Sequence, residues 1–524
     1  MPGPSADWFL TAAERGNPAS WIDRRHPRGE AFSRGNQVRA LVHGAQYFPR
    51  LLACVRAAGP GDLLMFTDWR GDPDERLDGP GTEVGAVLEE AARRGVDVRG
   101  LVWRSHLDRF RFSARENRHL GEEINAAGGQ CLLDMRVRPG GSHHQKLVVL
   151  RHAARPDDDV AFVGGVDLCH SRRDDADHAG DPQAQPMARA YGPRPPWHDV
   201  QLEVRGPAVA DLEMVFRERW DDPAPLSRDP VRRLGDAVRG DRVRQTALPA
   251  PLPAPGPRGT HRVQVLRTYP VRHPGYPFAP GGERSVARGY AKALARAREL
   301  VYVEDQYLWS AGVVRPFAEA LRRNRELRMV VVLPLLPDQD GRARPPNLVG
   351  RAPALAELRA AGGERFSVYG PENLAGTPVY VHAKVCVIDD TWAAVGSDNV
   401  NRRSWTHDSE VACAVVDEGG SGHSGFARDL RLRLAAEHLD LPTAELAASG
   451  AADGAGMAAA FAASAARLEA WHRSGRRGQR PPGRLRPYTQ EPQSATTRAW
   501  STVLYRVLYD PDCRTALARA RGVY

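Results

Sequence analysis

Two pairs of side chains in this sequence have the types and the spacing needed for chemistry on a phosphate ester. His144 and Lys146 form one pair, and His382 and Lys384 form the other. An apolar run follows each pair, and the alternation predicts a β-strand on which the histidine and the lysine project from one face. An imidazole exchanges protons or attacks near neutral pH, while an ammonium group neutralises phosphate charge.

The surroundings of the two pairs also repeat. After each apolar run the chain turns, returns through a second apolar strand and ends in a glycine turn, at 164–167 and at 396–399. Two copies in one chain indicate duplicated halves that could face each other and build one site. Backbone amides at glycine turns can approach an anion closely. The residues that we predict to bind the substrate phosphate are Gly164, Gly165, Asp167, Gly396, Ser397 and Asn399.

This double pattern resembles the phospholipase D superfamily, whose signature is H-x-K-x4-D followed by a G-[GS]-x-N-like turn. The second copy matches in full and includes Asp389. The first copy has Arg151 at the aspartate position and a longer hairpin, so we predict that an acid within 157–159 braces it instead. The first glycine turn and the Trp-His-Asp run at 197–199 resemble eukaryotic-type phospholipases D. The resemblance covers about 40–440.

The resemblance implies an α/β fold with two pseudo-repeated α/β/α halves packed around a shared active site. Alternating strands and helices independently predict parallel strands with crossover helices. Periodicity also predicts an amphipathic helix over about 37–57. We assign an N-terminal half to 1–235, a Pro-rich linker to 236–262, a C-terminal half to 263–442, and an Ala/Pro/Arg-rich extension to 443–524.

The resemblance further implies covalent catalysis, in which one histidine attacks phosphorus and the other protonates the leaving alcohol. It assigns the attack to His144 and the acid/base role to His382, an order that the residues alone do not fix. An acidic residue after each motif would orient the histidine of the other half: Asp199 for His382, and Asp408 or Glu410 for His144. The predicted catalytic set is His144, Lys146, His382, Lys384, Asp199, Asp408 and Glu410, with Asp389 and Glu304 in structural roles.

The composition limits the other classes of site. No Asp, Glu and His cluster has metal-ligand spacing, so we expect no metal and no cofactor. The six cysteines lack C-x-x-C spacing, which predicts reduced core cysteines. The net charge of +9 favours anionic partners. No apolar run is long enough for a membrane span, and no classical signal peptide is recognisable. We therefore expect a monomer that is cytoplasmic or peripheral to the membrane.

Three functions fit these features. The leading one is a phospholipase D that hydrolyses glycerophospholipids at a membrane surface and exchanges the headgroup when an alcohol replaces water. The alternative is another enzyme of the superfamily, either a cardiolipin-synthase-like phosphatidyltransferase or a nucleic-acid phosphodiesterase. A non-catalytic binding protein is the third, suggested by Arg151 but opposed by the presence of His144 and Lys146.

Overall fold

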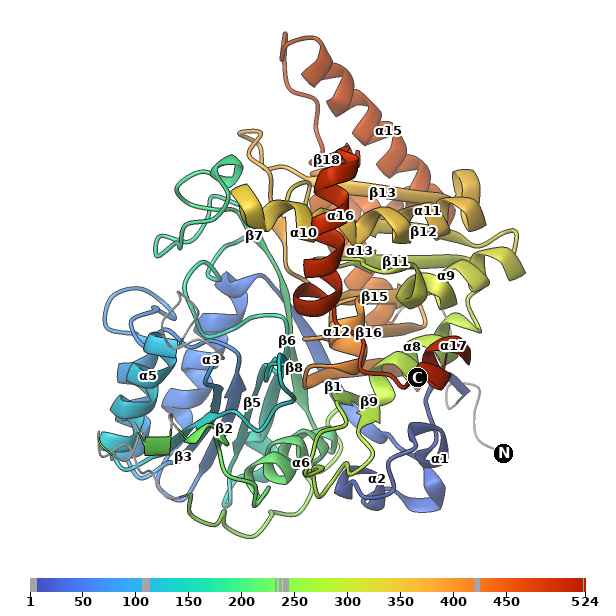
Figure 1. The fold of residues 1–524 in the computed structure, drawn as a ribbon. Helices are drawn as coiled ribbons and strands as arrows, with labels where there is room; N and C mark the ends of the chain where they lie inside the picture. The colour runs from blue at the N-terminus through green and yellow to red at the C-terminus, as the bar shows by residue number, and fades with distance from the viewer. Residues whose placement is uncertain are drawn as a thin grey trace.

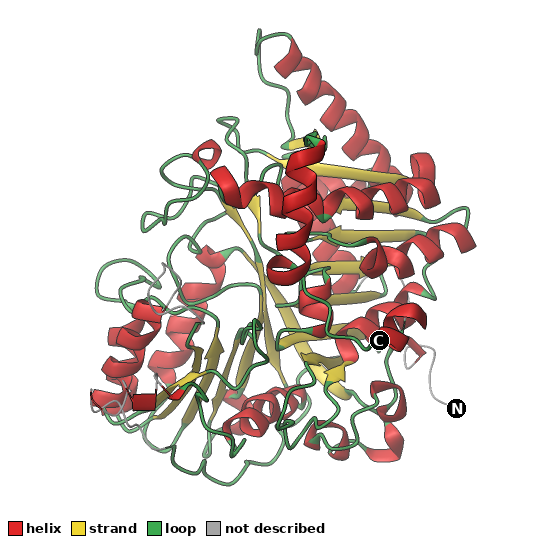
Figure 2. Ribbon diagram, viewed as in Figure 1, coloured by secondary structure: helices red, strands yellow, loops and turns green. Residues whose placement is uncertain are grey.

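A computed structural model describes residues 7–105, 114–230, 233–234, 238, 245–418, 425–521 and 523–524. One mixed β-sheet extends through the molecule, and helices pack on both of its faces (Figures 1 and 2). None of the helices in the described ranges has the length and apolarity needed to cross a bilayer.

The N-terminal half begins with two short helices and continues with alternating strands and helices. Its elements are α1 (Ala12–Arg15), α2 (Trp21–Arg24), β1 (Ser33–Val42), α3 (Gly44–Ala57), β2 (Leu63–Asp68), α4 (Val84–Arg93), β3 (Asp97–Trp103), α5 (Ala114–Ala126), β4 (Gln130–Asp134), β5 (Leu147–Arg151), β6 (Val160–Gly164), β7 (Trp197–His198), β8 (Val200–Arg205) and α6 (Ala208–Trp220).

The C-terminal half repeats this plan and is followed by further helices and one strand. Its elements are β9 (His261–Tyr269), β10 (Glu283–Arg284), α8 (Ser285–Leu294), β11 (Leu300–Glu304), α9 (Ala311–Arg323), β12 (Arg328–Val332), α10 (Arg344–Val349), α11 (Arg351–Gly362), β13 (Phe366–Pro371), β14 (Tyr380–Val381), β15 (Val385–Ile388), β16 (Trp392–Gly396), α12 (Arg402–Thr406), β17 (Glu410–Asp417) and α13 (Phe426–Leu439). The segments after it are α14 (Thr443–Ala448), α15 (Gly454–Arg473), β18 (Leu485–Pro487), α16 (Ala495–Leu504) and α17 (Ala516–Arg521).

The strand order confirms the predicted α/β fold with two repeated halves. One half of the sheet runs β1-β8-β6-β5-β2-β3-β4, and the other runs β9-β17-β16-β15-β11-β12-β13. The outer strands β2-β3-β4 and β11-β12-β13 are parallel, as their crossover helices require. The halves meet where β1 pairs antiparallel with β9. Read outward from this join, the strands of the two halves follow each other in equivalent order.

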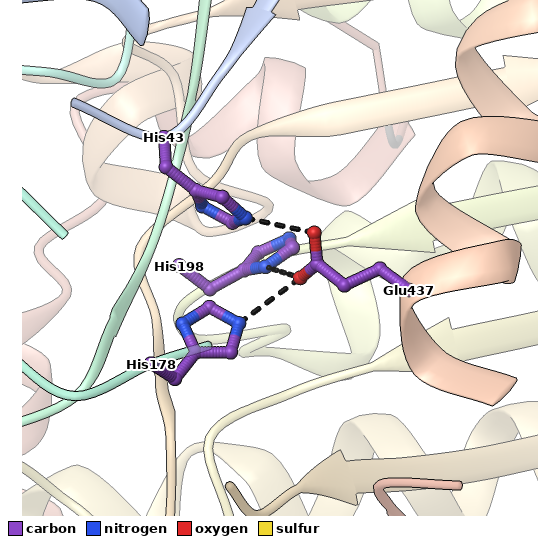
Figure 3. Close-up of side chains that lie close together, drawn as sticks. All are labelled: His43, His178, His198 and Glu437. Atoms are coloured by element: carbon purple, nitrogen blue, oxygen red, sulfur yellow. Dashed lines mark hydrogen bonds and ion pairs between the residues drawn. The ribbon is translucent and has the colours of Figure 1, made fainter. Parts of the chain in front are cut away.

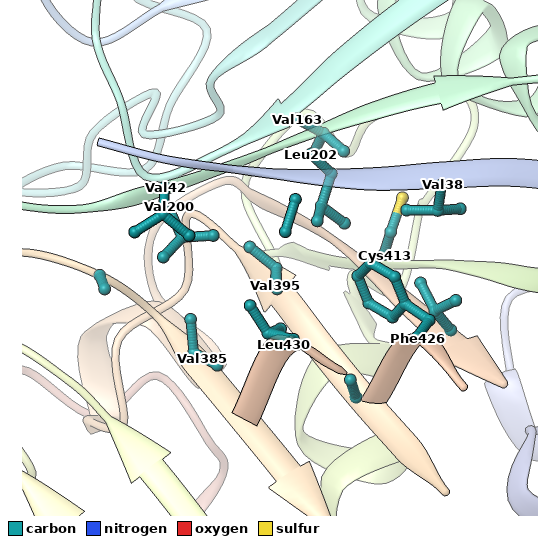
Figure 4. Packing of buried hydrophobic residues seen from close by; sticks show 14 of the residues in the cluster. Val38, Val42, Val163, Val200, Leu202, Val385, Val395, Cys413, Phe426 and Leu430 are labelled. Carbon is teal, nitrogen blue, oxygen red and sulfur yellow. The ribbon is translucent and has the colours of Figure 1, made fainter. Parts of the chain in front are cut away.

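A single hydrophobic core crosses the join between the halves. Val38, Val163 and Leu202 of the N-terminal half lie in one buried cluster with Val395 and Cys413 of the other, closed by α13 (Figure 4). Full burial of one such side chain contributes about 1.5–3 kcal/mol. The apolar contact therefore makes the two halves one packed body and fixes the interface at which the functional residues meet.

Both ends of the chain belong to this body. Leu10 donates its N–H to Gln264 Oε1 over 2.9 Å, and Arg15 pairs with Glu283 over 3.0 Å, so the N-terminal segment packs on the C-terminal half. At the other end, β18 pairs antiparallel with β13, and Phe461 of α15 is fully buried. The predicted extension from 443 therefore completes the sheet edge and the core.

The helix predicted over about 37–57 is wrong in its first part. Residues 33–42 form β1, in which Val38, Ala40 and Val42 are buried and residues 37 and 39 are exposed. Helix α3 starts only at Gly44. The apolar residues fit either period over a short window, and pairing with β8 and β9 decides in favour of the strand.

Candidate active site

Each histidine–lysine pair lies in an extended segment just before a strand, rather than on the strand as predicted. His144 and Lys146 precede β5, and His382 and Lys384 precede β15. The sheet ladder starts at the next residue in each case. The reason for the difference is that these segments pair with the opposite half of the protein instead of with their own sheet.

Backbone hydrogen bonds between the halves hold both motifs. The N–H of His144 donates to the carbonyl of Ser409 over 3.0 Å, and the N–H of His382 donates to the carbonyl of His198 over 2.8 Å. Strands β7 and β14 pair in parallel, and His143 forms a parallel bridge with Ser409. Ser409 and His198 therefore occupy equivalent places, each beside the motif of the other half.

Asp199 follows His198 and Glu410 follows Ser409, and each places a buried carboxylate against an imidazole of the other half. His382 Nδ1 lies 2.7 Å from Asp199 Oδ2, and His144 Nδ1 lies 2.9 Å from Glu410 Oε2. Both carboxylates are fully buried. A partner on Nδ1 fixes the ring orientation and leaves Nε2 as the nitrogen that is free to react. The predicted cross-pairing of acids and histidines is the arrangement that the side chains adopt.

Asp408 is not the partner of His144, although the sequence left it open as one. Its carboxylate accepts from the Ser142 N–H over 2.8 Å and from the Ser142 hydroxyl over 2.9 Å. Arg403 Nε also donates to it over 2.7 Å. Asp408 lies one residue before the parallel bridge and Glu410 one after it, so Asp408 braces the segment before the motif.

The two lysines are buried beside the histidines. Lys146 Nζ donates to the His144 carbonyl over 3.1 Å and lies 3.2 Å from Asp167 Oδ1. Lys384 Nζ donates to the His382 carbonyl. Burial lowers the pKa of the Lys384 ammonium group to about 8. The lysines therefore place positive charge directly behind the imidazoles.

The two imidazoles share one electrostatic environment. Burial, followed by the charges of the nearby lysines, lowers the pKa of both His144 and His382 well below the usual value. Lys146, Lys384 and Asp167 act on both rings. The neutral, nucleophilic form of each imidazole is therefore favoured at neutral pH in the absence of substrate.

Ser397, predicted to bind the phosphate, contacts Glu410 instead. Its hydroxyl donates to Glu410 Oε2 over 2.5 Å and accepts the N–H of Val411 over 3.1 Å. Burial, with the neighbouring Asp408 charge, raises the pKa of Glu410 to about 8. The hydrogen bond from Ser397 opposes this rise in pKa and stabilises the charged form of the carboxylate that contacts His144.

The glycine-turn amides are already paired, which corrects the predicted phosphate cradle. The N–H of Gly165 donates to the Val200 carbonyl over 3.0 Å, and that of Gly396 to the Lys384 carbonyl over 3.3 Å. The Ser397 N–H donates to a carbonyl of β17 over 2.9 Å. Sheet pairing uses these donors because the turns lie inside the sheet rather than at its edge.

The glycines are instead required by close packing. A Cβ on Gly165 would lie 2.0 Å from Asp199 Oδ1, and one on Gly164 would lie 2.5 Å from the Val200 carbonyl. A Cβ on Gly396 would lie 2.3 Å from that of Ala412. The small residue at 165 therefore lets the Asp199 carboxylate approach the glycine turn closely.

Asp167 and Asn399 occupy the last position of each glycine turn. Asp167 binds Lys146, as described above, while Asn399 is buried and its Oδ1 has no hydrogen-bond partner within the described residues. Of the predicted phosphate-binding set, these two keep polar side chains next to the motifs.

Three further charged residues beside the motifs were not predicted as part of the site. Asp68 is the last residue of β2, and Asp305 follows the last residue of the equivalent strand β11. Each accepts a backbone N–H of the segment after a glycine turn, from Leu168 over 3.0 Å and from Val400 over 2.8 Å. An acid after each apolar strand was the available signal. Arg172 lies 3.9 Å from the Trp197 ring centroid. Its charge also lowers the pKa of His382, but the sequence shows it only as part of a polar loop.

The residues with predicted structural roles have clear partners. Asp389 accepts the N–H groups of residues 298–300 over 2.7–2.9 Å and so braces the turn before β11. Glu304 accepts from His198 Nε2 over 2.6 Å and from His438 Nε2 over 2.8 Å.

The first hairpin replaces the missing motif aspartate in a different way. Arg151 is buried and donates from Nε to Asp159 Oδ2 over 2.8 Å, while Asp157 and Asp158 are exposed. Asp159 also accepts the N–H of His152 over 2.6 Å. Of the three acids at 157–159, Asp159 is therefore the one that braces the first hairpin.

Comparison with known proteins places both halves in one group. The family model described as phospholipase D matches residues 73–268, and the model described as the PLD-like domain of cardiolipin synthase matches 290–427. Phospholipase D alpha 1 of Brassica oleracea var. capitata is 24% identical over 495 residues, with 70% of this chain and 60% of that protein covered. Phospholipase D1 of Schizosaccharomyces pombe is 26% identical over 392 residues, with 58% of this chain and 27% of that protein covered.

A solved structure supports the same fold. The crystal structure of phosphatidylserine synthase from Haemophilus influenzae Rd KW20 superimposes with a TM-score of 0.52 at 13% identity, covering 90% of this chain and 94% of that one. The chain spans about 60% of the length of the plant relative.

Proposed function

Because the chain belongs to the phospholipase D superfamily, we propose that it is a phospholipase D-type phosphodiesterase acting on glycerophospholipids. One observation carries the proposal: two imidazoles from different halves each have Nδ1 on a buried carboxylate of the opposite half and a buried lysine two residues away. This arrangement supports two complementary roles at one phosphorus atom.

The first step forms a covalent intermediate. His144 Nε2 attacks phosphorus, the bond from phosphorus to the headgroup oxygen breaks, and His382 gives its Nε2 proton to the leaving alcohol. The anionic phosphodiester offsets the two ammonium charges and so raises the pKa of the imidazoles when it binds. The assignment of attack to His144 follows the superfamily resemblance.

The second step reverses the path. His382 removes a proton from water, the water oxygen bonds to phosphorus, and the phosphorus–nitrogen bond to His144 breaks. Phosphatidic acid leaves, and the proton balance of the enzyme is restored. An alcohol in place of water gives a new phosphatidyl ester by the same step.

Buried positive charge supports both steps. Lys146 and Lys384 stand behind the imidazoles, and Arg172 lies 3.7 Å from Asp167 beside them. Fixed charges in a site shielded from water stabilise the additional negative charge of the transition state without reorganisation. Asn399 is the remaining polar side chain that we assign to the phosphate.

Aromatic side chains favour a lipid headgroup. Trp69 stacks on Trp103 with ring centroids 5.5 Å apart, and the Trp69 ring lies 6.3 Å from that of His144. Aromatic faces attract quaternary ammonium groups such as choline. A phosphatidyltransferase is the second candidate, supported by the match of the second half to the cardiolipin synthase model.

Parallel assays separate these activities. Vesicles of phosphatidylcholine report choline release, vesicles of phosphatidylglycerol report cardiolipin, and supercoiled plasmid reports nicking. We expect choline release that falls to background in His144→Ala and His382→Asn. Cardiolipin formation without choline release would support the transferase, plasmid nicking without lipid turnover would support a nuclease, and inactivity in all three assays would contradict an enzyme of this type.

A further inference from the structure

A second cluster of titratable side chains lies outside the active site, and the mechanism does not use it. His43, His178 and His198 all point at the carboxylate of Glu437 (Figure 3). Their nearest nitrogens, His43 Nε2, His178 Nε2 and His198 Nδ1, lie 2.8, 3.0 and 3.1 Å from its oxygens. The three histidines are at most 2% exposed.

Four separate segments supply these side chains. His43 lies between β1 and α3, His178 in the loop before β7, His198 in β7, and Glu437 on α13. Three come from the N-terminal half and one from the C-terminal half. No two of these residues are close in sequence. A search for metal-ligand spacing in the sequence therefore could not find them.

The donor set is that of a closed zinc site. Three imidazole nitrogens and one carboxylate satisfy four-coordinate zinc, and a site with four protein ligands is structural rather than catalytic. The ligand atoms all lie within 4.8 Å of one another. Zinc bonds of about 2.0–2.2 Å separate tetrahedral ligands by roughly 3.4 Å, so only small side-chain movements are needed.

Outer partners orient two of the histidines as metal ligands are oriented. His198 presents its other nitrogen to Glu304 over 2.6 Å, and the second nitrogen of His178 lies 3.6 Å from Asp174. A carboxylate behind a metal-bound imidazole fixes the tautomer and makes the ligand more basic. Hydrogen bonding alone would instead require His198 to donate from both nitrogens.

Backbone conformation points the same way. His43 and His178 have φ values of 69° and 55°, in the region that residues other than glycine rarely adopt. Such strain persists only where the surroundings enforce it, and it is concentrated at functional and ligand-binding sites. Both strained residues aim their Nε2 atoms at the same carboxylate.

A cleft gives an ion access to the cluster. A cavity of about 480 Å³ has His43 and Glu437 in its wall, together with Arg433 and Asp440. Two of the four ligands therefore line an open cavity, which offers the entry path that a metal site needs.

We propose that His43, His178, His198 and Glu437 bind one structural zinc ion that links the two halves. The link includes β7, whose next residue is Asp199, the partner of His382. A fixed β7 holds this carboxylate in place. The ion takes no part in the phosphoryl transfer, and the proposal does not depend on which phosphodiester is the substrate.

The test uses the untagged full chain and measures bound metal directly. After exposure to equimolar zinc and gel filtration, elemental analysis should give close to one zinc per chain. Cobalt in place of zinc should give the intense visible absorption of a tetrahedral site. Thermal unfolding should shift to higher temperature with zinc and return after chelation.

Two variants and a control complete the test. Glu437→Gln and, in case it misfolds, His43→Asn should lose the bound zinc and the shift in unfolding temperature. His119→Asn, an exposed histidine outside the cluster, should keep both. Less than one tenth of an equivalent of zinc in the parent chain, or zinc retained in both cluster variants, would overturn the proposal.

Discussion

The carboxylate behind each imidazole determines what that imidazole can do. Asp199 and Glu410 each approach an Nδ1 atom from the opposite half, and neither is accessible to water. They hold each ring by Nδ1 and leave Nε2 for the phosphate chemistry that we propose. A carboxylate also stabilises the ring when it carries a proton or a phosphorus bond, which is when the ring is cationic.

Glu410 and Asp408 provide a matched pair of substitutions. Glu410→Gln should lower kcat on the order of 10²-fold with little change in KM, because it misdirects His144 without removing it. Asp408→Asn should cost less than tenfold, since Asp408 holds the preceding segment and acts on His144 and Glu410 only through its charge. Steady-state kinetics on phosphatidylcholine vesicles measure both. Equal losses in the two variants would contradict the assignment of Glu410.

The Lys384 ammonium group predicts a limit at high pH. Its pKa is lowered to about 8 by burial, so it loses its proton and its charge as the pH rises through this value. The loss of that charge should make kcat/KM fall about tenfold per pH unit above 8. On the acid side, activity should persist below pH 6.5, because the imidazole pKa values are lowered.

A pH–rate profile of kcat/KM on a soluble phosphodiester tests this limit without interference from vesicle charge. The Lys384→Arg variant keeps its charge throughout the range and serves as the control. Its profile should lack the additional tenfold loss per pH unit that begins near pH 8 in the parent. A parent profile that stays flat for more than one unit above pH 8 would contradict a charged Lys384 in catalysis.

At the scale of elements, the glycine turns set how near the acid-bearing strands come to the motifs. Gly165 lies against Asp199, where a Cβ would come within 2.0 Å of the carboxylate. The turn amides are used by the sheet, so the contribution of these glycines is space rather than anion binding.

Gly165→Ala should therefore displace Asp199 and reduce kcat on the order of 10²-fold, with a loss of about 1–3 kcal/mol in stability from overpacking. Gly59→Ala is the control, since a Cβ there meets no atom within 4 Å. Activity and thermal unfolding of both variants are the measurements. Parent-like kcat in Gly165→Ala would show that the close approach is dispensable.

The sequence predicted the repeated motifs and the elements around them, because residue types and alternation are local. It did not predict β1 and β9, the strands that join the halves. Val38 and Leu41 fit a helical as well as a strand period, and only pairing across the join settles the choice. Glu410 rather than Asp408 faces His144 for a similar reason: the two acids lie two residues apart and share one face of an extended segment, so only the pairing of Ser409 with the segment before the motif decides which of them meets the ring.

At the scale of the whole molecule, the two halves cannot be treated as separate units. The core crosses the join, the N-terminal segment packs on the C-terminal half, and the chain beyond 443 supplies a strand and a buried helix face. The motifs are consequently fixed by the entire chain. The His43, His178, His198 and Glu437 cluster lies across the same join.

Substitutions in the C-terminal segment test this integration. Phe461→Ala should destabilise the protein by about 3–5 kcal/mol, because a fully buried aromatic side chain leaves a cavity. Val503→Ala, at a side chain that is 62% exposed, should change stability by less than about 0.5 kcal/mol. Denaturant midpoints compare the two. A Phe461→Ala midpoint equal to that of the parent would mean that the segment is only an appendage.

The covalent intermediate is the most direct test of the account. The His382→Asn variant, which lacks the group that activates water, should be mixed with a phosphatidyl ester of p-nitrophenol, whose leaving group needs no proton from His382. The reaction should be quenched under conditions that preserve phosphorus–nitrogen bonds and mapped by peptide mass spectrometry. The proposed mechanism predicts a phosphatidyl adduct on His144 in this variant and none in His144→Ala. Choline release by the parent enzyme that persists in His144→Ala, with no adduct on either histidine, would contradict it.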